Sequence, residues 1–286
     1  MKEIAPGRRP VRRLLLGAAA AAGYAALGAR AQSLASKAAG NDKGWRLLVN
    51  EAVTGESSIF ILTARYRTLA DYISAQLRRP PIGVEPVVDI QRFLGLAKAP
   101  NKPELVFGKS VNQLAKLVRD DGYQPVVRRA DPYKAAFIVA KDSPIKSFAD
   151  LEKNRAKIIT PDEFAATTAV ARAELRRQKV TQVQLVHTRY QEAVAQQITN
   201  GFGQVGVVNP TIAKKWTEEG GRVLAETLPV VNWSVLASPL LSEAEVAQLR
   251  NALLASPPDV LKSVGVKQWA AAERKDYLAL LEYTKE

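Results

Sequence analysis

Residues 104–118 read ELVFGKSVNQLAKLV, and this stretch decides the fold class. Residues 104–107 predict a short strand, and Gly108-Lys109-Ser110 form a turn that leads into a helix. The apolar face of this helix is marked by Val111, Leu114, Ala115 and Val118. A strand followed at once by an amphipathic helix is the repeating unit of an α/β protein.

The same alternation extends in both directions from this unit. On its N-terminal side the pattern predicts a strand at 47–53, a helix at 57–79 and a strand at 82–88. On its C-terminal side extended segments at 126–129 and 135–140 precede a second series: strand 158–160, helix 163–178, strand 183–187, a helix from Tyr190, strand 205–208 and a helix from Pro210. An extended segment at 233–236 and a helix opened by Ser242 follow, and a terminal amphipathic segment through Val264, Trp269 and Leu278 closes the order. We therefore expect two α/β lobes of similar size, with the chain returning to the first.

The first 31 residues have the form of a secretory signal. A basic region ends at Arg13, an apolar stretch runs from Leu14 to Leu27, and Ala29-Arg30-Ala31 provides an A-x-A cleavage site before Gln32. The alternative is an uncleaved membrane anchor, but 14 apolar residues fall short of the roughly 20 that a spanning helix needs. Arg12-Arg13 also has the twin-arginine form. We expect a periplasmic protein that is exported by this signal, and the twin-arginine route is open beside the general secretory route.

Composition excludes several classes of site. The 286 residues contain no cysteine and one histidine, which removes disulfides, thiolate metal sites and multi-histidine metal sites. The formal charge is +13, but without the first 31 residues 35 basic and 27 acidic residues remain, a net +8 over 255 residues. These charges are scattered among one another, without the basic stripe that nucleic-acid binding requires. We expect no metal, no cofactor and no nucleic-acid partner.

Three short motifs do not meet their structural context. Residues 201–206 match G-x-G-x-x-G, but a predicted helix precedes them and a strand follows, the reverse of a dinucleotide site. The Gly-Lys-Ser of residues 108–110 lacks the upstream glycine of a phosphate-binding loop, because Pro103 stands there. Ser143 and Lys146 fit S-x-x-K, without its companion motifs. These motifs carry no functional prediction.

Small polar residues gather instead at the junctions where predicted strands lead into helices. Ligands of open α/β sheets bind beyond the carboxyl ends of strands, where helix N-termini present unpaired amide donors that suit anions. Ordinary helix capping explains serine at such places equally well. The candidate ligand-binding residues at these junctions are Thr54, Ser57, Ser58, Gly108, Lys109, Ser110, Asp162, Thr167, Thr168, His187, Tyr190 and Asn209.

Three stretches carry a family resemblance. Residues 104–110 (ELVFGKS), 122–125 (GYQP) and 141–151 (KDSPIKSFADL) resemble periplasmic phosphate/phosphite/phosphonate-binding proteins of ABC importers. The resemblance covers roughly 47–236 and implies a type II periplasmic-binding fold, in which ligand lies between two lobes. It implies a lobe 1 of residues 45–137 and 236–286 and a lobe 2 of residues 138–235. It also implies hinges near 136–140 and 233–236.

Carrying the family site across adds Tyr66 to the candidates and places His187 where some phosphonate binders have a ligand-contacting histidine. This chain departs from the family where a Ser-Thr-Ser-Gly run is expected, because residues 164–167 are Phe-Ala-Ala-Thr. Asp162 and Glu163 also place negative charge at that helix N-terminus, which opposes an anionic ligand. Gln204 replaces a family aspartate.

The resemblance implies an exported solute-binding protein of an ABC-type importer, with a small polar ligand of phosphonate, phosphite or phosphate type and permease subunits as partners. We expect no enzymatic activity. Two alternatives are open at this point: a ligand-sensing or degenerate binding module whose cleft is filled by 164–166, and an enzyme on the same fold. In the enzyme His187 or Asp162 would act as acid or base.

Overall fold

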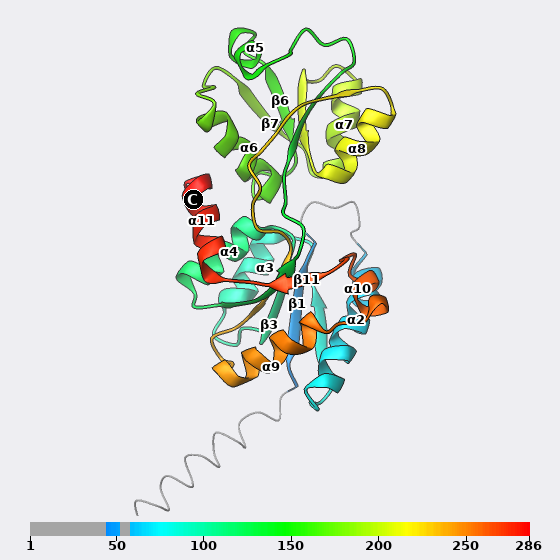
Figure 1. The fold of residues 1–286 in the computed structure, drawn as a ribbon, viewed down its shortest axis with the longest axis vertical. Coiled ribbons are helices and arrows are strands. Elements are labelled where there is room, and N and C mark those ends of the chain that lie inside the picture. The colour runs from blue at the N-terminus through cyan, green and yellow to red at the C-terminus, as the bar shows by residue number, and fades with distance from the viewer. Residues whose placement is uncertain (1–43, 52–57) are drawn as a thin grey trace, which may run out of the picture. The chain divides into compact units, whose positions relative to one another are not determined.

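The computed structural model describes residues 44–51 and 58–286. Residues 45–286 form one compact unit, built on two mixed β-sheets with helices packed on them (Figure 1). We name the part built on the six-stranded sheet lobe 1 and the part built on the five-stranded sheet lobe 2.

Lobe 1 holds the strand–helix unit of residues 104–118. Its elements are β1 (Arg46–Asn50), α2 (Ile59–Gln76), β2 (Gly83–Pro86), α3 (Ile90–Lys98), β3 (Leu105–Gly108), α4 (Val111–Asp120), β4 (Gln124–Arg129), β10 (Ser234–Ala237), α9 (Glu243–Leu254), α10 (Pro258–Ser263), β11 (Trp269–Ala271) and α11 (Arg274–Thr284). The strand order is β11-β4-β10-β3-β1-β2, with β1 parallel to β2 and β3. Strand β10 returns from lobe 2 and pairs antiparallel with both β3 and β4.

Lobe 2 has the same construction with one strand fewer. Its elements are β5 (Ala136–Val139), α5 (Phe148–Lys153), β6 (Lys157–Thr160), α6 (Ala166–Arg177), β7 (Gln184–His187), α7 (Gln191–Thr199), β8 (Val205–Val208), α8 (Pro210–Glu218) and β9 (Arg222–Glu226). The strand order is β7-β6-β8-β5-β9. Strand β6 is parallel to β7 and β8, whereas β5 is antiparallel to β8 and β9.

Two segments join the lobes, residues 130–135 and 227–233. They pair with each other through an antiparallel bridge between Tyr133 and Val230, with both backbone hydrogen bonds at 2.9 Å. The C-terminal helix α11 forms a third link, since it packs against α4 of lobe 1 and α6 of lobe 2. The Tyr283 hydroxyl on α11 donates to Glu174 on α6 at 3.1 Å.

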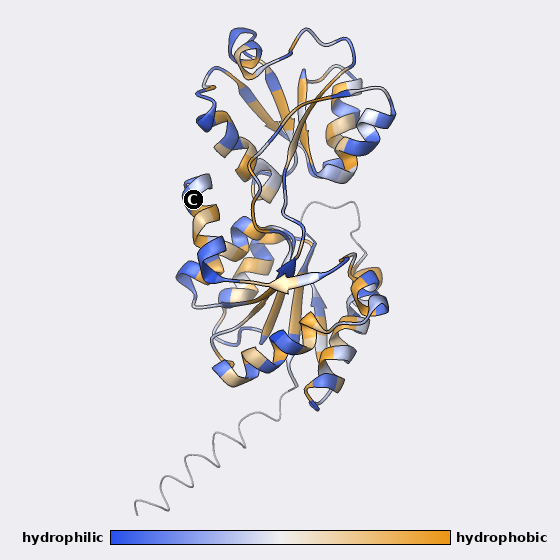
Figure 2. Ribbon diagram, in the orientation of Figure 1, coloured by the Kyte–Doolittle hydropathy of each residue, from blue (hydrophilic) through white to orange (hydrophobic). Residues whose placement is uncertain are grey.

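The strands are hydrophobic because most of them are covered on both faces by helices. Every residue of β3, β5, β8 and β10 is buried, and Figure 2 shows the hydrophobic colour concentrated in the strands. Gly108, the last residue of β3, has no room for a side chain, because an added Cβ would lie 2.9 Å from Leu114 Cδ2 on α4. The absence of a side chain at this position lets α4 begin directly after the carboxyl end of β3.

The α/β class, with two mixed sheets flanked by helices, is confirmed. The sequence pattern missed α3, β9, α10 and β11, and it placed the start of α6 three residues too early. The Asp162 side chain accepts a hydrogen bond from the Phe164 amide at 2.9 Å, and the Ala165 amide donates to the Asp162 carbonyl at 3.0 Å. These bonds form a turn, so the helix begins only at Ala166.

We propose that the lobes meet within residues 130–135 and 227–233. The sequence placed the lobe boundaries at 137/138 and 235/236, inside β5 and β10, and the hinges in the same strands. In the structure each of these strands pairs within a single sheet, and such pairing resists the backbone rotation that a hinge needs.

No helix in the part of the chain described here is both long enough and apolar enough to span a bilayer.

Candidate functional site

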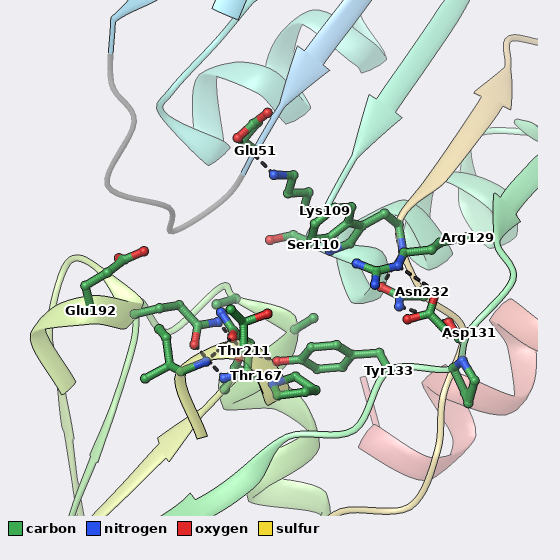
Figure 3. A pocket seen from close by; sticks show the side chains of 18 residues that line it. Glu51, Lys109, Ser110, Arg129, Asp131, Tyr133, Thr167, Glu192, Thr211 and Asn232 are labelled. Atoms are coloured by element: carbon green, nitrogen blue, oxygen red, sulfur yellow. Dashed lines mark hydrogen bonds and ion pairs between the residues drawn. The ribbon is translucent and has the colours of Figure 1, made fainter. Parts of the chain in front are cut away.

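A cavity of about 280 Å³ lies where the two lobes and the joining segments meet (Figure 3). Lobe 1 contributes the ends of β1, β3 and β4, lobe 2 contributes the starts of α6, α7 and α8, and the joining segments form one wall. The side chains that the argument below uses are Glu51, Lys109, Ser110, Arg129, Asp131, Tyr133, Thr167, Gln191, Glu192, Asn209 and Trp233. We call this cavity the interlobe pocket.

Four helix N-termini converge on the interlobe pocket. Its lining includes Ser110 before α4, Ala165 before α6, Gln191 at the start of α7 and Asn209 before α8. The N-cap positions of α4, α6 and α7 have no side-chain hydrogen bond, whereas the Asn209 side chain caps α8 by accepting from the Ile212 amide. Each N-terminus is equivalent to roughly +0.5 elementary charge, so together they favour a negatively charged guest.

Glu51 follows β1 and is bound by three side chains of lobe 1. Lys109 Nζ lies 2.9 Å from its Oε2, and Arg65 Nη1 and the Tyr66 hydroxyl both lie 2.8 Å from its Oε1. Burial alone would raise the pKa of Glu51, but these neighbours outweigh it and hold the pKa below its ordinary value. Burial lowers the pKa of Lys109, and the nearby positive charges of Arg65 and Arg129 lower it further, against the opposing effect of Glu51. The one lysine that lines the described pocket is therefore paired with a charged carboxylate.

A second ion pair links the last residue of β4 to the first joining segment. Arg129 Nε donates to Asp131 Oδ1 at 2.6 Å. The Arg129 guanidinium also lies 4.8 Å from the centre of the Trp233 ring, and Lys109 Nζ lies 4.2 Å from the same ring. The indole holds both cations at the pocket wall through cation–π contacts.

Tyr133, Thr167, Gln191 and Asn209 form a hydrogen-bond chain on the lobe 2 side. Gln191 Oε1 accepts from the Asn209 amide at 2.9 Å, which fixes Gln191 Nε2 as the donor to Thr167 Oγ1 at 2.6 Å. The Tyr133 and Thr167 hydroxyls then share one hydrogen bond at 2.5 Å. Burial raises the pKa of Tyr133 to about 12, so the phenol keeps its proton at neutral pH.

This chain contains one more hydroxyl proton than it uses. Tyr133 and Thr167 have two hydroxyl protons, and a single proton fills the bond between them. Among the described residues no acceptor is found for the other. Both residues line the pocket, so one O–H is left for an acceptor atom of a bound molecule.

Ser110 supplies a second unused hydroxyl, from lobe 1. It is 3% exposed, its Oγ has no hydrogen-bond partner among the described residues, and its side chain does not cap α4. A buried hydroxyl without a partner costs about 1–3 kcal/mol. Because Ser110 lines the pocket, a bound molecule can provide the missing partner (Figure 3).

The structure brings some of the predicted site residues together and separates others. Lys109, Ser110, Thr167 and Asn209 line the interlobe pocket. Asp162 and Tyr190 line a neighbouring cavity of about 200 Å³ that also reaches Ala165. Thr54 and Ser57 lie outside the described residues.

The remaining predicted site residues line neither cavity, and each has a structural role. Ser58 caps α2, and Tyr66 binds Glu51 from a fully buried position. Gly108 ends β3, and the Thr168 hydroxyl donates to the Pro161 and Asp162 carbonyls.

His187 is exposed at the end of β7. Its Nδ1 lies 2.7 Å from Thr160 Oγ1, and its Nε2 lies 3.2 Å from Arg172 Nη2. Arginine only donates, so Nε2 is the acceptor and Nδ1 carries the proton toward Thr160. These contacts orient the ring outside the interlobe pocket.

Sequence reasoning missed pocket residues of the joining segments, the last residue of β4 and the residue after β1. Asp131 and Tyr133 lie between the predicted extended segments 126–129 and 135–140, whereas Arg129, Trp233 and Glu51 lie inside segments predicted as extended (126–129, 233–236 and 47–53). A cluster of charged and aromatic residues between two extended segments was the available signal at 128–133. The described residues contain no cluster of three or more His, Cys, Asp or Glu side chains arranged to hold a metal ion.

Comparisons with solved structures agree with this architecture. PhnD1 from Prochlorococcus marinus in complex with methylphosphonate matches with a TM-score of 0.67 at 15% identity, over 84% of this chain and 97% of that one. XAC2383 from Xanthomonas citri bound to ATP matches with a TM-score of 0.68 at 15% identity, over 85% and 98% of the two chains. A binding protein component of an ABC phosphonate transporter from Pseudomonas aeruginosa matches with a TM-score of 0.64 at 14% identity, over 84% and 85%. These likenesses establish the type II periplasmic-binding fold.

No curated protein sequence matches the chain. The family model for the periplasmic phosphonate substrate-binding protein of ABC transporters matches residues 60–277, most of the chain. Members of this family are substrate-binding components with a periplasmic location. The chain belongs to this family of periplasmic substrate-binding proteins of phosphonate ABC transporters.

Proposed function

We propose that this protein captures a small solute bearing oxygen acceptors in the interlobe pocket and presents it to the permease of an ABC importer. The observation that carries the proposal is the set of unused donors that face one cavity from both lobes: the Ser110 hydroxyl, the spare hydroxyl proton of Tyr133 and Thr167, and the N-termini of α6 and α7, which have no side-chain cap. One guest accepting from both lobes would hold them together.

Capture would work by closure of the lobes about residues 130–135 and 227–233. These segments lie outside both sheets and are joined to each other by a short ladder, which includes the Tyr133–Val230 bridge and a bond from the Thr227 amide to the Ala135 carbonyl at 2.9 Å. A rotation of the lobes would bend this ladder and leave the pairing within the two sheets intact. A bound solute would stabilise the closed arrangement by its greater affinity for it, and the permease would recognise the closed form. Binding alone accounts for the donors, and we propose no chemical turnover. The exposed position of His187 outside the pocket supports this view.

The ligand class we propose overlaps with phosphonate, phosphite and phosphate and extends to other small oxyanions. Ala165 and Ala166 line the pocket without filling it, which favours a working site over a degenerate one. We propose delivery to the periplasm by the signal of residues 1–31, with cleavage before Gln32 and with the twin-arginine route open.

The test is calorimetry and thermal-shift screening of the purified mature chain against a broad panel of phosphonates, sulfonates, carboxylates, sugars and amines. Saturable binding would raise the melting temperature by mass action. Small-angle scattering with and without the best solute would show a decrease in the radius of gyration. Absence of binding across the panel, or turnover of one of its members, would contradict the proposal.

A further inference from the structure

The ionisable residues that line the interlobe pocket are balanced in a way that bears on ligand charge. The two cations, Lys109 and Arg129, are each joined to a carboxylate, Glu51 at 2.9 Å and Asp131 at 2.6 Å. Glu192 adds a third carboxylate at the start of α7, on an exposed residue. The five side chains together have a formal charge of −1.

The helix N-termini change the sign of this total. Four of them reach the pocket, and each is equivalent to roughly +0.5 elementary charge, so they offset the formal −1 and leave about +1. Such a field matches one negative charge better than two. A second charge on the guest would face Glu51, Asp131 and Glu192 with no additional unpaired cation among the lining residues.

The donors set the chemistry of the guest. Ser110 Oγ is 3% exposed and unpartnered, and with the spare proton of the Tyr133–Thr167 pair it requires acceptor oxygens on the ligand. Lys109 has protons beyond the one it gives to Glu51, and these too can only donate. The ligand's polar end is therefore an oxygen acceptor, and its charge is limited by the neighbouring carboxylates.

We infer that the pocket selects a singly charged oxyanion and discriminates against the dianionic form of the same group. This inference rests on the proposed function and names the substrate class of that site. A sulfonate, a carboxylate or a singly protonated phosphonate would bind, and deprotonation of the phosphonate would weaken it. Selectivity of this kind comes from repulsive elements as much as from attractive ones.

The experiment compares methylphosphonate with methanesulfonate, which has a similar tetrahedral head but keeps one charge. Calorimetry is run at a pH well below and at a pH well above the second pKa of the phosphonate. This pKa lies near neutrality, and the second pKa of a phosphate monoester, about 6, is comparable. Protonation of the protein itself affects the dissociation constants of both ligands at each pH. The ratio of the two constants therefore reports only the change in charge of the phosphonate. We expect the sulfonate preference to increase at least about tenfold as the phosphonate becomes a dianion.

Two variants locate the effect. Asp131→Asn frees the Arg129 charge, and Glu192→Gln removes the exposed carboxylate. Each substitution should raise the affinity for the phosphonate dianion, relative to that for the sulfonate, about tenfold over the wild-type value. Glu226→Gln is the matched control, since Glu226 also forms an exposed ion pair, with Lys134 at 3.1 Å, but lies outside the pocket. This control should leave the ratio unchanged.

The outcomes separate this inference from the proposed function. Tighter binding of the dianion than of the monoanion by the wild-type protein would overturn the inference, as would an equal change of the ratio in Glu226→Gln. If a neutral solute that bears oxygen acceptors, such as a sugar of the panel, binds while methanesulfonate, methylphosphonate and acetate do not, the inference is wrong and solute capture in the pocket stands. If no solute binds, both are wrong.

Discussion

Lys109 Nζ lies 2.9 Å from Glu51 Oε2, which joins the end of β3 to the residue after β1 across 58 positions of sequence. The Glu51 side chain is 4% exposed and the Lys109 side chain 12% exposed. The pair thus fixes a charged side chain of the pocket before any ligand arrives. It also commits one cation of lobe 1 to the protein itself.

Glu51→Gln should destabilise the protein by about 3 kcal/mol, because it leaves Lys109 and Arg65 without their buried carboxylate. Urea unfolding measures the change. The matched control is Glu226→Gln, whose exposed ion pair with Lys134 should contribute less than about 1 kcal/mol. Equal effects of the two substitutions would show that the Glu51 cluster adds little to stability.

The acid limb of the stability profile should also depend on Glu51. Its pKa is lowered in the folded protein from the ordinary 4.5, so its contribution is present above that pH and is lost as the pH falls through the folded-state value. Unfolding free energies measured downward from neutral pH should decrease less steeply in Glu51→Gln than in the wild type below about pH 4.5. Parallel profiles would contradict the assignment.

Ser110→Ala should change stability and affinity in opposite directions. Removing a buried hydroxyl that has no partner leaves the ligand-free protein equally stable or up to about 1 kcal/mol more stable. The affinity for the best solute of the panel should fall about tenfold, as expected for one lost hydrogen bond. Calorimetry and urea unfolding on the same variant give both quantities. A loss of stability without a loss of affinity would mean that Ser110 has only a structural role.

Removing both hydroxyls of the Tyr133–Thr167 pair, in Tyr133→Phe with Thr167→Val, should weaken ligand binding about tenfold, because the proton that the pair leaves for the guest is lost. Tyr133→Phe alone should weaken binding less, since Thr167 then keeps an unused proton. Tyr123→Phe is the matched control, because Tyr123 is also a buried tyrosine and its hydroxyl donates to the Ala97 carbonyl at 2.7 Å, away from the pocket. An equal loss of affinity in the double variant and in the control would refute the assignment to the pair.

Gly108→Ala should destabilise the protein by about 1–3 kcal/mol, because the new Cβ would lie 2.9 Å from Leu114 Cδ2 at the junction of β3 and α4. Gly95→Ala provides the contrast. Gly95 lies within α3, with nothing within 4 Å of an added Cβ, so alanine should stabilise the helix by about 1 kcal/mol. Thermal unfolding of the two variants should shift in opposite directions, and shifts in the same direction would contradict the packing argument.

The sequence predicted the elements whose pattern is local. Strand β3 and helix α4 were expected from residues 104–118, and α9 was expected from Ser242 with Glu245, which form a capping box in the structure. Such features depend on one buried face or on one side chain near its own backbone. The location of polar residues at strand–helix junctions was likewise readable, and four of those residues line the pocket.

Tertiary structure alone decided which of those residues share a cavity and how they are charged. Glu51 lies in the sequence of a buried strand, yet it neutralises Lys109, and Tyr133 meets Thr167 from 34 positions away. The insertion of β10 between β3 and β4 and the packing of α11 against both lobes are also long-range. The spacing of apolar residues predicts which face of a helix or strand is buried. It does not predict what that face packs against, because the hydrophobic effect has no preferred direction or partner. Partners of hydrogen bonds and ion pairs are directional, so they are fixed only when distant segments have packed.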